Sequence, residues 1–262
     1  MREILDLDRY PLDRVGTAEW RNLVDRCVAD LAENGMFNLE GLLLPGVAEK
    51  AVEEIQPVMN TRSHEHKRSH NIYFKPEIAE LYAGHPALRK VETVSHTVCA
   101  DQIPSSTVLA IYEYEPLIHF LAATMGKSAL YPMQDPLARV NVMSYRHGET
   151  LNWHFDRSEF TTTLLLQEPE AGGEFEYRSD LRADDDPNYD GVARLLEGLD
   201  PKVKSLRLTA GNLNVFRGKN TAHRVTSVRG NRERMIAVFS YYERAGVVFS
   251  DEEKLGFYGR AA

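Results

Sequence analysis

Cysteine is scarce in this sequence, with only Cys27 and Cys99 among 262 residues. They lie far apart and form no Cys-x-x-Cys pair, which argues against a disulfide framework and against a thiolate zinc site. Residues 1–8 lack the apolar core of a secretion signal, and no apolar run approaches membrane-spanning length. We therefore expect a cytoplasmic protein with no membrane partner.

An excess of basic residues is also absent. The chain carries 31 Lys and Arg against 39 Asp and Glu, a net charge of −8. Such a balance gives no broad basic surface, so we expect no nucleic-acid partner. The hydrophobic content of 43% is enough to bury a sizeable interior, in one large domain or a core with an appendage.

The short segment of residues 152–156 contains a histidine and a carboxylate two positions apart, His154 and Asp156. In a strand these two side chains face the same side. Imidazole and carboxylate together suit a divalent cation such as iron, and a third ligand would complete a three-ligand face with open positions for chemistry. His223, later in the chain, is the candidate third ligand.

Arg234 begins an apolar, strand-like segment, residues 234–242. A buried arginine beside a metal could form a two-pronged pair with the far end of a dicarboxylate. Burying it among apolar residues is costly unless an anion meets it. An Asp or Glu of the protein is the alternative partner.

Together these segments resemble, in order and spacing, the iron(II)- and 2-oxoglutarate-dependent oxygenases. Prolyl-hydroxylase-like members come closest in motif, whereas the tail is more similar to a subgroup that contains free-amino-acid halogenases and their hydroxylase relatives. The motif match covers about residues 140–260, and the N-terminal half resembles only that subgroup. The matching segments are residues 145–148, 154–156, 170–175, 211–213 and 223–226, Arg234, and the tail at 240–249 and 257–260.

The resemblance implies Fe(II), 2-oxoglutarate and O2 as cofactors, with the two histidines and the aspartate as metal ligands. It also implies that Arg234 anchors 2-oxoglutarate, and that Tyr145, which matches the family's tyrosine, donates to it with help from Asn141. The serine usually found two residues after the arginine is replaced here by Ile236.

Asp156 separates two outcomes within the subgroup. In the halogenating relatives a small residue replaces the metal carboxylate and leaves room for chloride. This sequence keeps the carboxylate, so the resemblance implies hydroxylation of an unactivated C–H bond in a small molecule, a free amino acid or a derivative. Arg157 stands where recognition of a cationic side chain would need an acid, so we do not carry that specificity over.

From residue 138 the hydrophobic periodicity changes to two, and eight short strand candidates follow. They predict a mostly β fold with flanking helices, in which a double-stranded β-helix (jelly roll) encloses a cavity. Residues 1–137 are predicted as a helical N-terminal region packed on the core of residues 138–262, the two forming one structural unit. Within the first region we expect helices over 17–33, 47–59, 86–100 and 105–126 and a strand over 36–44.

Residues 62–71 form a basic, histidine-rich stretch that we interpret as a loop. Arg68, His70 and Asn71 could hold a substrate carboxylate near the pocket mouth, with residues 72–74 following as a short strand. A charge run of this kind more often just faces water, so a solvated loop is the alternative.

A second metal site built from His64, His66 and His70 is a further alternative for this stretch. On strand alternation Asn152 and Ser240 are predicted to point inward and touch substrate.

Residues 178–201 form one conspicuous insertion, which could serve as a lid or as surface decoration. It could close over a small molecule or grip a peptide, so a protein side-chain hydroxylase of the prolyl-hydroxylase type is an alternative function. A non-catalytic jelly-roll binding or sensor protein is another. A zinc or manganese hydrolase would leave Arg234 without a role. The oligomeric state is not predicted.

Overall fold

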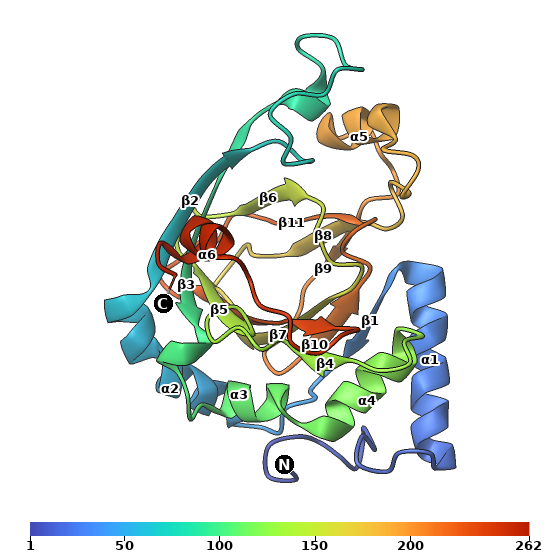
Figure 1. Ribbon diagram of the computed structural model, residues 1–262, viewed down its shortest axis with the longest axis vertical. Coiled ribbons are helices and arrows are strands. Elements are labelled where there is room, and N and C mark those ends of the chain that lie inside the picture. Colours follow the sequence, from blue (N-terminus) through green and yellow to red (C-terminus); the bar gives the residue numbers. More distant parts are fainter. Residues whose placement is uncertain (262) are drawn as a thin grey trace.

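Two antiparallel β-sheets face each other in the computed structural model, which describes residues 1–261 (Figure 1). The larger sheet has the order β1-β10-β7-β12-β5-β3-β2 and the smaller one β6-β11-β8-β9. This arrangement confirms the predicted jelly roll, and each of the eight predicted strands is found. The large sheet contains β1 (Met36–Leu39), β2 (His64–His70), β3 (Val91–Cys99), β5 (Val140–Tyr145), β7 (Thr161–Gln167), β10 (Leu213–Phe216) and β12 (Arg234–Phe239). The small sheet contains β6 (Leu151–His154), β8 (Phe175–Arg178), β9 (Lys204–Leu206) and β11 (Ala222–Val225), and a separate pair joins β4 (Tyr131–Pro132) to β13 (Tyr241–Tyr242).

Four helices from the first half of the chain pack on the outer face of the large sheet (Figure 1). The first begins at the N-cap Thr17, whose hydroxyl accepts from the Trp20 amide, and ends at Gly35, where φ is 74°. None of the helices within residues 1–261 has the length and apolar character needed to cross a bilayer. The helices are α1 (Ala18–Asn34), α2 (Val47–Arg62), α3 (Thr107–Tyr112), α4 (Glu115–Thr124), α5 (Tyr189–Leu196) and α6 (Asp251–Tyr258).

Strand alternation divides the large sheet into a helix-facing side and a cavity-facing side. On β12, Met235 and Ala237 belong to the core shared with the helices. Arg234, Ile236 and Val238 on the same strand line a cavity between the two sheets. The helices therefore support the sheet from outside while its inner face is left for a binding site.

Three predictions in the first half were wrong. The basic stretch is not a loop but β2, which pairs with β3 from His64 to His70. The predicted helix over 86–100 is a single 3-10 turn, Pro86–Leu88, followed by β3. Residues 72–74 form a turn, in which Phe74 has a φ of 55°, instead of a strand.

The first half of the chain therefore contributes three strands, β1, β2 and β3, to the large sheet, which also contains β5, β7, β10 and β12. The division of the chain at residue 138 stays a prediction.

The insertion of residues 178–201 contains α5 and packs against the turn that follows β2. Leu181 and Val192 share an apolar cluster with Ile72 and Tyr73, and the Tyr73 hydroxyl donates to the Pro187 carbonyl at 2.5 Å. In Figure 1, α5 lies beside the segment that follows β2, at one end of the two sheets. The insertion is thus a packed part of the fold.

Candidate metal centre and cavity

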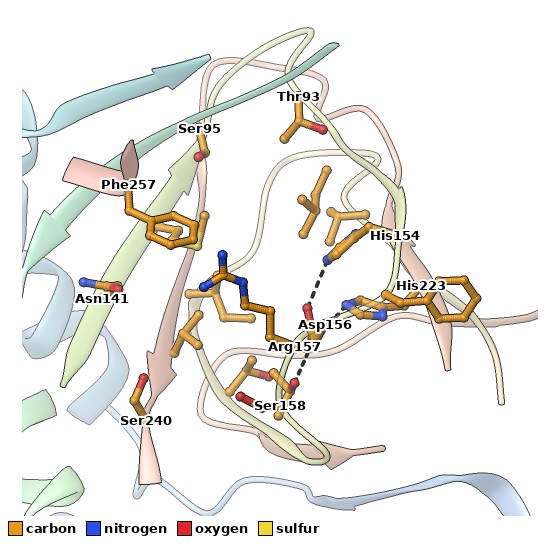
Figure 2. Close-up of a pocket in the computed structure, with 18 of the residues that line it drawn as sticks. Thr93, Ser95, Asn141, His154, Asp156, Arg157, Ser158, His223, Ser240 and Phe257 are labelled. Carbon is orange, nitrogen blue, oxygen red and sulfur yellow. Dashed lines mark hydrogen bonds and ion pairs between the residues drawn. The ribbon is translucent and has the colours of Figure 1, made fainter. Parts of the chain in front are cut away.

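His154, Asp156 and His223 meet at the inner face of the small sheet (Figure 2). His154 and His223 lie directly opposite each other on β6 and β11, with ring centroids 4.1 Å apart. The Nε2 atoms lie 3.3 Å (His154) and 3.4 Å (His223) from oxygens of Asp156. One ligand atom from each residue falls within 4.8 Å of the other two, close enough to bind one ion. The structure therefore brings together the three residues that the sequence suggested.

Backbone contacts fix the histidine tautomers. Nδ1 of His154 lies 2.8 Å from the Asn152 carbonyl oxygen, and Nδ1 of His223 lies 3.0 Å from the Thr221 carbonyl oxygen. A carbonyl only accepts, so each Nδ1 must carry the proton and each Nε2 presents a lone pair toward the shared centre. Metal-bound histidines are commonly held in this way.

Asp156 is positioned as an ionised carboxylate. Burial opposes its ionisation, but in the absence of a metal ion protonated His223 and hydrogen bonds from protonated Nε2 atoms outweigh this and hold the pKa of Asp156 well below its usual value. A metal ion bound at the centre would take the place of those Nε2 protons. The Thr161 hydroxyl donates to Oδ2 at 2.5 Å, and the Asp156 amide donates to the Gly218 carbonyl at 3.0 Å. A Cβ at position 218 would lie 2.5 Å from the same Oδ2, so glycine is needed for this close approach.

A cavity of about 770 Å³ opens from this cluster into the space between the sheets. Arg234 projects into it with an exposed fraction of only 2%, opposite Tyr145, which is 1% exposed. Burial lowers the pKa of Arg234 to about 10, so the guanidinium is charged at neutral pH. The hydroxyl of Tyr145 has a weak contact with the sulfur of Met143, 4.0 Å away, as its one recorded polar contact.

No carboxylate within residues 1–261 lies within ion-pair distance of Arg234. A buried cation without a protein partner is costly, and a bound carboxylate would remove that cost. The donor set therefore fits the predicted cofactors: two neutral imidazoles and a carboxylate suit Fe(II), and Arg234 with Tyr145 suits the far carboxylate of 2-oxoglutarate.

The remaining predicted residues divide between cavity wall and scaffold. Arg68, His70, Asn141 and Ser240 line the cavity. The amide of Asn141 is already engaged, since its nitrogen donates to the Leu137 carbonyl and its oxygen accepts from the hydroxyl of Tyr258 at 2.8 Å. Its assistance to 2-oxoglutarate stays a prediction.

Asn71 and Asn152 are not among the residues that line the cavity. The side-chain oxygen of Asn71 accepts from the amides of Tyr73 and Lys75, which holds the turn after β2. The side chain of Asn152 donates to the Glu92 carbonyl at 2.7 Å and ties β6 to β3. These hydrogen bonds give both asparagines a structural role, and the predicted substrate contact stays a prediction.

Asn214 is a cavity residue that sequence reasoning missed. It is 1% exposed on β10 and lines the cavity, yet neither its amide nitrogen nor its oxygen has a hydrogen-bond partner among the described residues. The same holds for the hydroxyl of Ser95 on β3, which Figure 2 shows at the cavity wall. A polar residue in the middle of Leu213–Phe216 was the available signal.

A jelly roll with this His-Asp-His cluster and a buried arginine is the architecture of the iron(II)- and 2-oxoglutarate-dependent oxygenases, which confirms the predicted class. The chain belongs to the Halogenase D (HalD) family, whose model matches residues 20–250. No curated protein sequence matches it.

Solved structures of this class share the fold at low sequence identity. The epimerase SnoN in complex with Fe3+, alpha-ketoglutarate and nogalamycin RO is 14% identical, with a TM-score of 0.57 over 84% of this chain and 84% of that chain. A prolyl hydroxylase from Trichoplax adhaerens, in complex with a hypoxia-inducible-factor peptide fragment, is 11% identical, with a TM-score of 0.54 over 87% of this chain and 94% of that one. A 2OG-Fe(II) oxygenase-family oxidoreductase from Burkholderia pseudomallei is 16% identical, with a TM-score of 0.52 and coverages of 86% and 92%.

Proposed function

We propose that this protein is a dioxygenase that uses Fe(II) and 2-oxoglutarate to hydroxylate an unactivated C–H bond of a small molecule, a free amino acid or a derivative. The observation that carries the proposal is the buried cluster of His154, Asp156 and His223 opening into a cavity that also contains the unpaired Arg234.

Each of these residues has a defined task. His154, Asp156 and His223 would hold Fe(II) on one face and leave adjacent positions open toward the cavity. Arg234 and Tyr145 would bind the far carboxylate of 2-oxoglutarate and so set its orientation. When bound, iron supplies the site at which O2, 2-oxoglutarate and a substrate C–H bond are converted to succinate, CO2 and a C–OH group.

Asp156 supports hydroxylation over halogenation, although the family is named for a halogenase. Its carboxylate is oriented by Thr161 and packed against Gly218, and it contacts both histidines. A carboxylate held in this way fills the ligand position that chloride would need.

The insertion supports a small-molecule substrate over a protein substrate. Arg182 from this segment lines the cavity, and α5 packs beside the turn at residues 71–75. Both features make the insertion part of the cavity wall and its surroundings, which suits a compound that fits within the cavity.

The proposal is tested by incubating the iron-loaded protein with 2-oxoglutarate, O2, chloride and a panel of amino acids. We expect substrate-stimulated succinate release and a product heavier by one oxygen, detected by mass spectrometry. A chlorinated product would overturn the hydroxylase assignment. Failure to bind or consume 2-oxoglutarate under every condition would overturn the proposal as a whole and favour a non-catalytic binding protein.

A further inference from the structure

The wall of the cavity is strongly cationic, although the whole chain has a net charge of −8. Asp156 is the sole acid among the described residues that line it, and that carboxylate belongs to the metal cluster. The cavity therefore offers no counter-ion to a cationic substrate side chain. Its lysine and arginine residues are Arg68, Arg157, Arg182, Lys219 and Arg234.

Two of these cations already have carboxylate partners. Arg157 is exposed and pairs with Glu253 of α6 at 2.8 Å, and Figure 2 shows its side chain turned toward the side of the cavity where Phe257 lies. Lys219 pairs with Asp184 at 2.7 Å. Arg234 is assigned to 2-oxoglutarate, so Arg68 and Arg182 remain.

Arg68 reaches the cavity from β2. It is half-buried, and its guanidinium lies 4.5 Å from the ring centroid of Phe74. The ring of Phe74 in turn packs edge-on against His154, with centroids 6.0 Å apart. One aromatic ring therefore separates Arg68 from the metal cluster. No carboxylate within residues 1–261 forms an ion pair with Arg68.

Arg182 reaches the cavity from the insertion. Its guanidinium stacks 4.0 Å from the ring centroid of Phe155, the residue between two predicted metal ligands. Its Nε donates to the Lys219 carbonyl at 2.7 Å, which fixes the plane of the group. Its two terminal nitrogens have no recorded acceptor within the described part of the chain, and they remain available to an anion.

Burial lowers the pKa of both Arg68 and Arg182, with Arg157 adding to the effect at Arg68. Each is thus a partly desolvated positive charge without a carboxylate partner. Such groups are costly unless a ligand supplies the missing charge.

The charge balance of the site with Fe(II) and 2-oxoglutarate bound indicates which charges the substrate carries. Fe(II) is balanced by Asp156 and the carboxylate of 2-oxoglutarate next to the keto group, and Arg234 is balanced by the other carboxylate. Arg68 and Arg182 then leave two positive charges uncompensated. We propose that the substrate is a small molecule with two anionic groups, such as an amino acid with an acidic side chain, and that Arg68 and Arg182 each bind one of those groups.

This inference rests on the proposed function and identifies its substrate class. It also makes the insertion a substrate-binding element.

A panel matched in shape tests the charge requirement. Calorimetry on the protein loaded with Fe(II) and 2-oxoglutarate, kept free of oxygen, would measure binding of L-aspartate, L-glutamate and L-2-aminoadipate beside L-asparagine, L-glutamine and L-lysine. At least one acidic amino acid should bind about tenfold or more tightly than its amide counterpart, and lysine should bind more weakly than either. Equal binding of acid and amide, tighter binding of lysine, or no binding by any acidic compound would overturn the proposal.

Three variants test the two arginines. Arg68→Gln and Arg182→Gln should each weaken binding of the acidic compound by about tenfold or more, and each should narrow its advantage over the amide. Arg21→Gln removes the same charge from the exposed surface of α1 and is the matched control. If the two cavity variants bind the acidic compound as tightly as Arg21→Gln does, the assignment is wrong.

Binding of 2-oxoglutarate and its slow turnover without substrate provide the separate readout for the proposed function. If the protein binds and slowly turns over 2-oxoglutarate but does not prefer acidic amino acids, the proposed function stands and only the proposed substrate class is wrong.

Discussion

Arg234 of β12 lies directly opposite Tyr145 of β5, and both side chains are almost completely buried on the cavity side of the large sheet. Burial raises the pKa of the Tyr145 phenol and lowers that of the Arg234 guanidinium, so the phenol is neutral beside a cation. Neither group satisfies the other through a recorded hydrogen bond. The pair is therefore free to bind a ligand. A substitution here should change ligand affinity and protein stability in different ways.

Replacing Arg234 with methionine should weaken binding of 2-oxoglutarate by at least about thirtyfold, because the far carboxylate loses its partner. The thermal unfolding midpoint without ligand should stay the same or rise, since a buried cation without a carboxylate is removed. Calorimetry and thermal unfolding, with and without 2-oxoglutarate, measure both effects. Arg232→Met, at an exposed position in the same segment, is the control. Unchanged 2-oxoglutarate affinity in Arg234→Met would remove the assigned role.

Thr161 orients the carboxylate of Asp156 through the hydrogen bond to Oδ2. Thr161→Val should lower the affinity for Fe(II) by about ten- to one hundredfold, because partners that orient a ligand typically contribute that much. The affinity for Fe(II) is measured under anaerobic conditions by competition with a chelator. Thr162→Val changes the neighbouring residue on the opposite face of β7 and should leave the affinity intact. Equal affinities in the two variants would show that Thr161 does not position the carboxylate.

Much of the fold could be predicted because the second half of the chain has a period-two hydrophobic pattern. The side chains of β12 alternate between the helix-facing core and the cavity. His154 and Asp156 also meet as predicted, although β6 ends at His154 and Asp156 lies in the segment after it. The pattern fails at β2, whose exposure alternates along His64–His70 although every residue is polar. Its inward residues His66, Arg68 and His70 line the cavity and are polar, so burial alternates along β2 without an alternation of hydrophobicity.

The hydrogen-bond partners of the asparagines also could not be predicted from the sequence. Asn71, Asn141 and Asn152 bond to groups brought near by the turn after β2, by α6 and by β3. Asn214 differs from them because its amide is left unpaired at the cavity wall. Only the folded chain separates these cases, since all four are asparagines in or beside strands.

Asn214→Leu should therefore raise the unfolding midpoint and impair the enzyme. Removing a buried amide that has no partner removes its desolvation cost, whereas any ligand that bonds to this amide loses a contact. Thermal unfolding and steady-state kinetics of succinate release would show higher stability together with lower kcat/KM. Asn38→Leu replaces the residue opposite on β1, outside the cavity, and should leave kcat/KM unchanged. Matching kinetics in the two variants would mean that Asn214 faces no ligand.

His70 makes the stability depend on pH in a direction that the structure specifies. Its Nε2 lies 2.9 Å from the Thr93 hydroxyl and its Nδ1 lies 3.0 Å from the Asn71 carbonyl. Burial lowers the pKa of His70 below 6.5, and the charges of His154 and Arg68 add to this, against the hydrogen bond to Asn71. As the pH falls through 6.5, His70 becomes protonated in the unfolded chain, whereas it stays neutral in the folded protein. The stability contributed by neutral His70 is thus present above that pH and is lost below it.

Thermal unfolding at about pH 7.5 and about pH 5.5 should show a lower midpoint in acid, and a smaller difference in His70→Gln than in the unaltered protein. The difference should shrink without vanishing, because burial lowers the pKa of His154 as well. His119→Gln, on the exposed surface of α4, should keep the full difference. If His70→Gln behaves like His119→Gln, proton uptake at His70 is not what weakens the folded protein in acid.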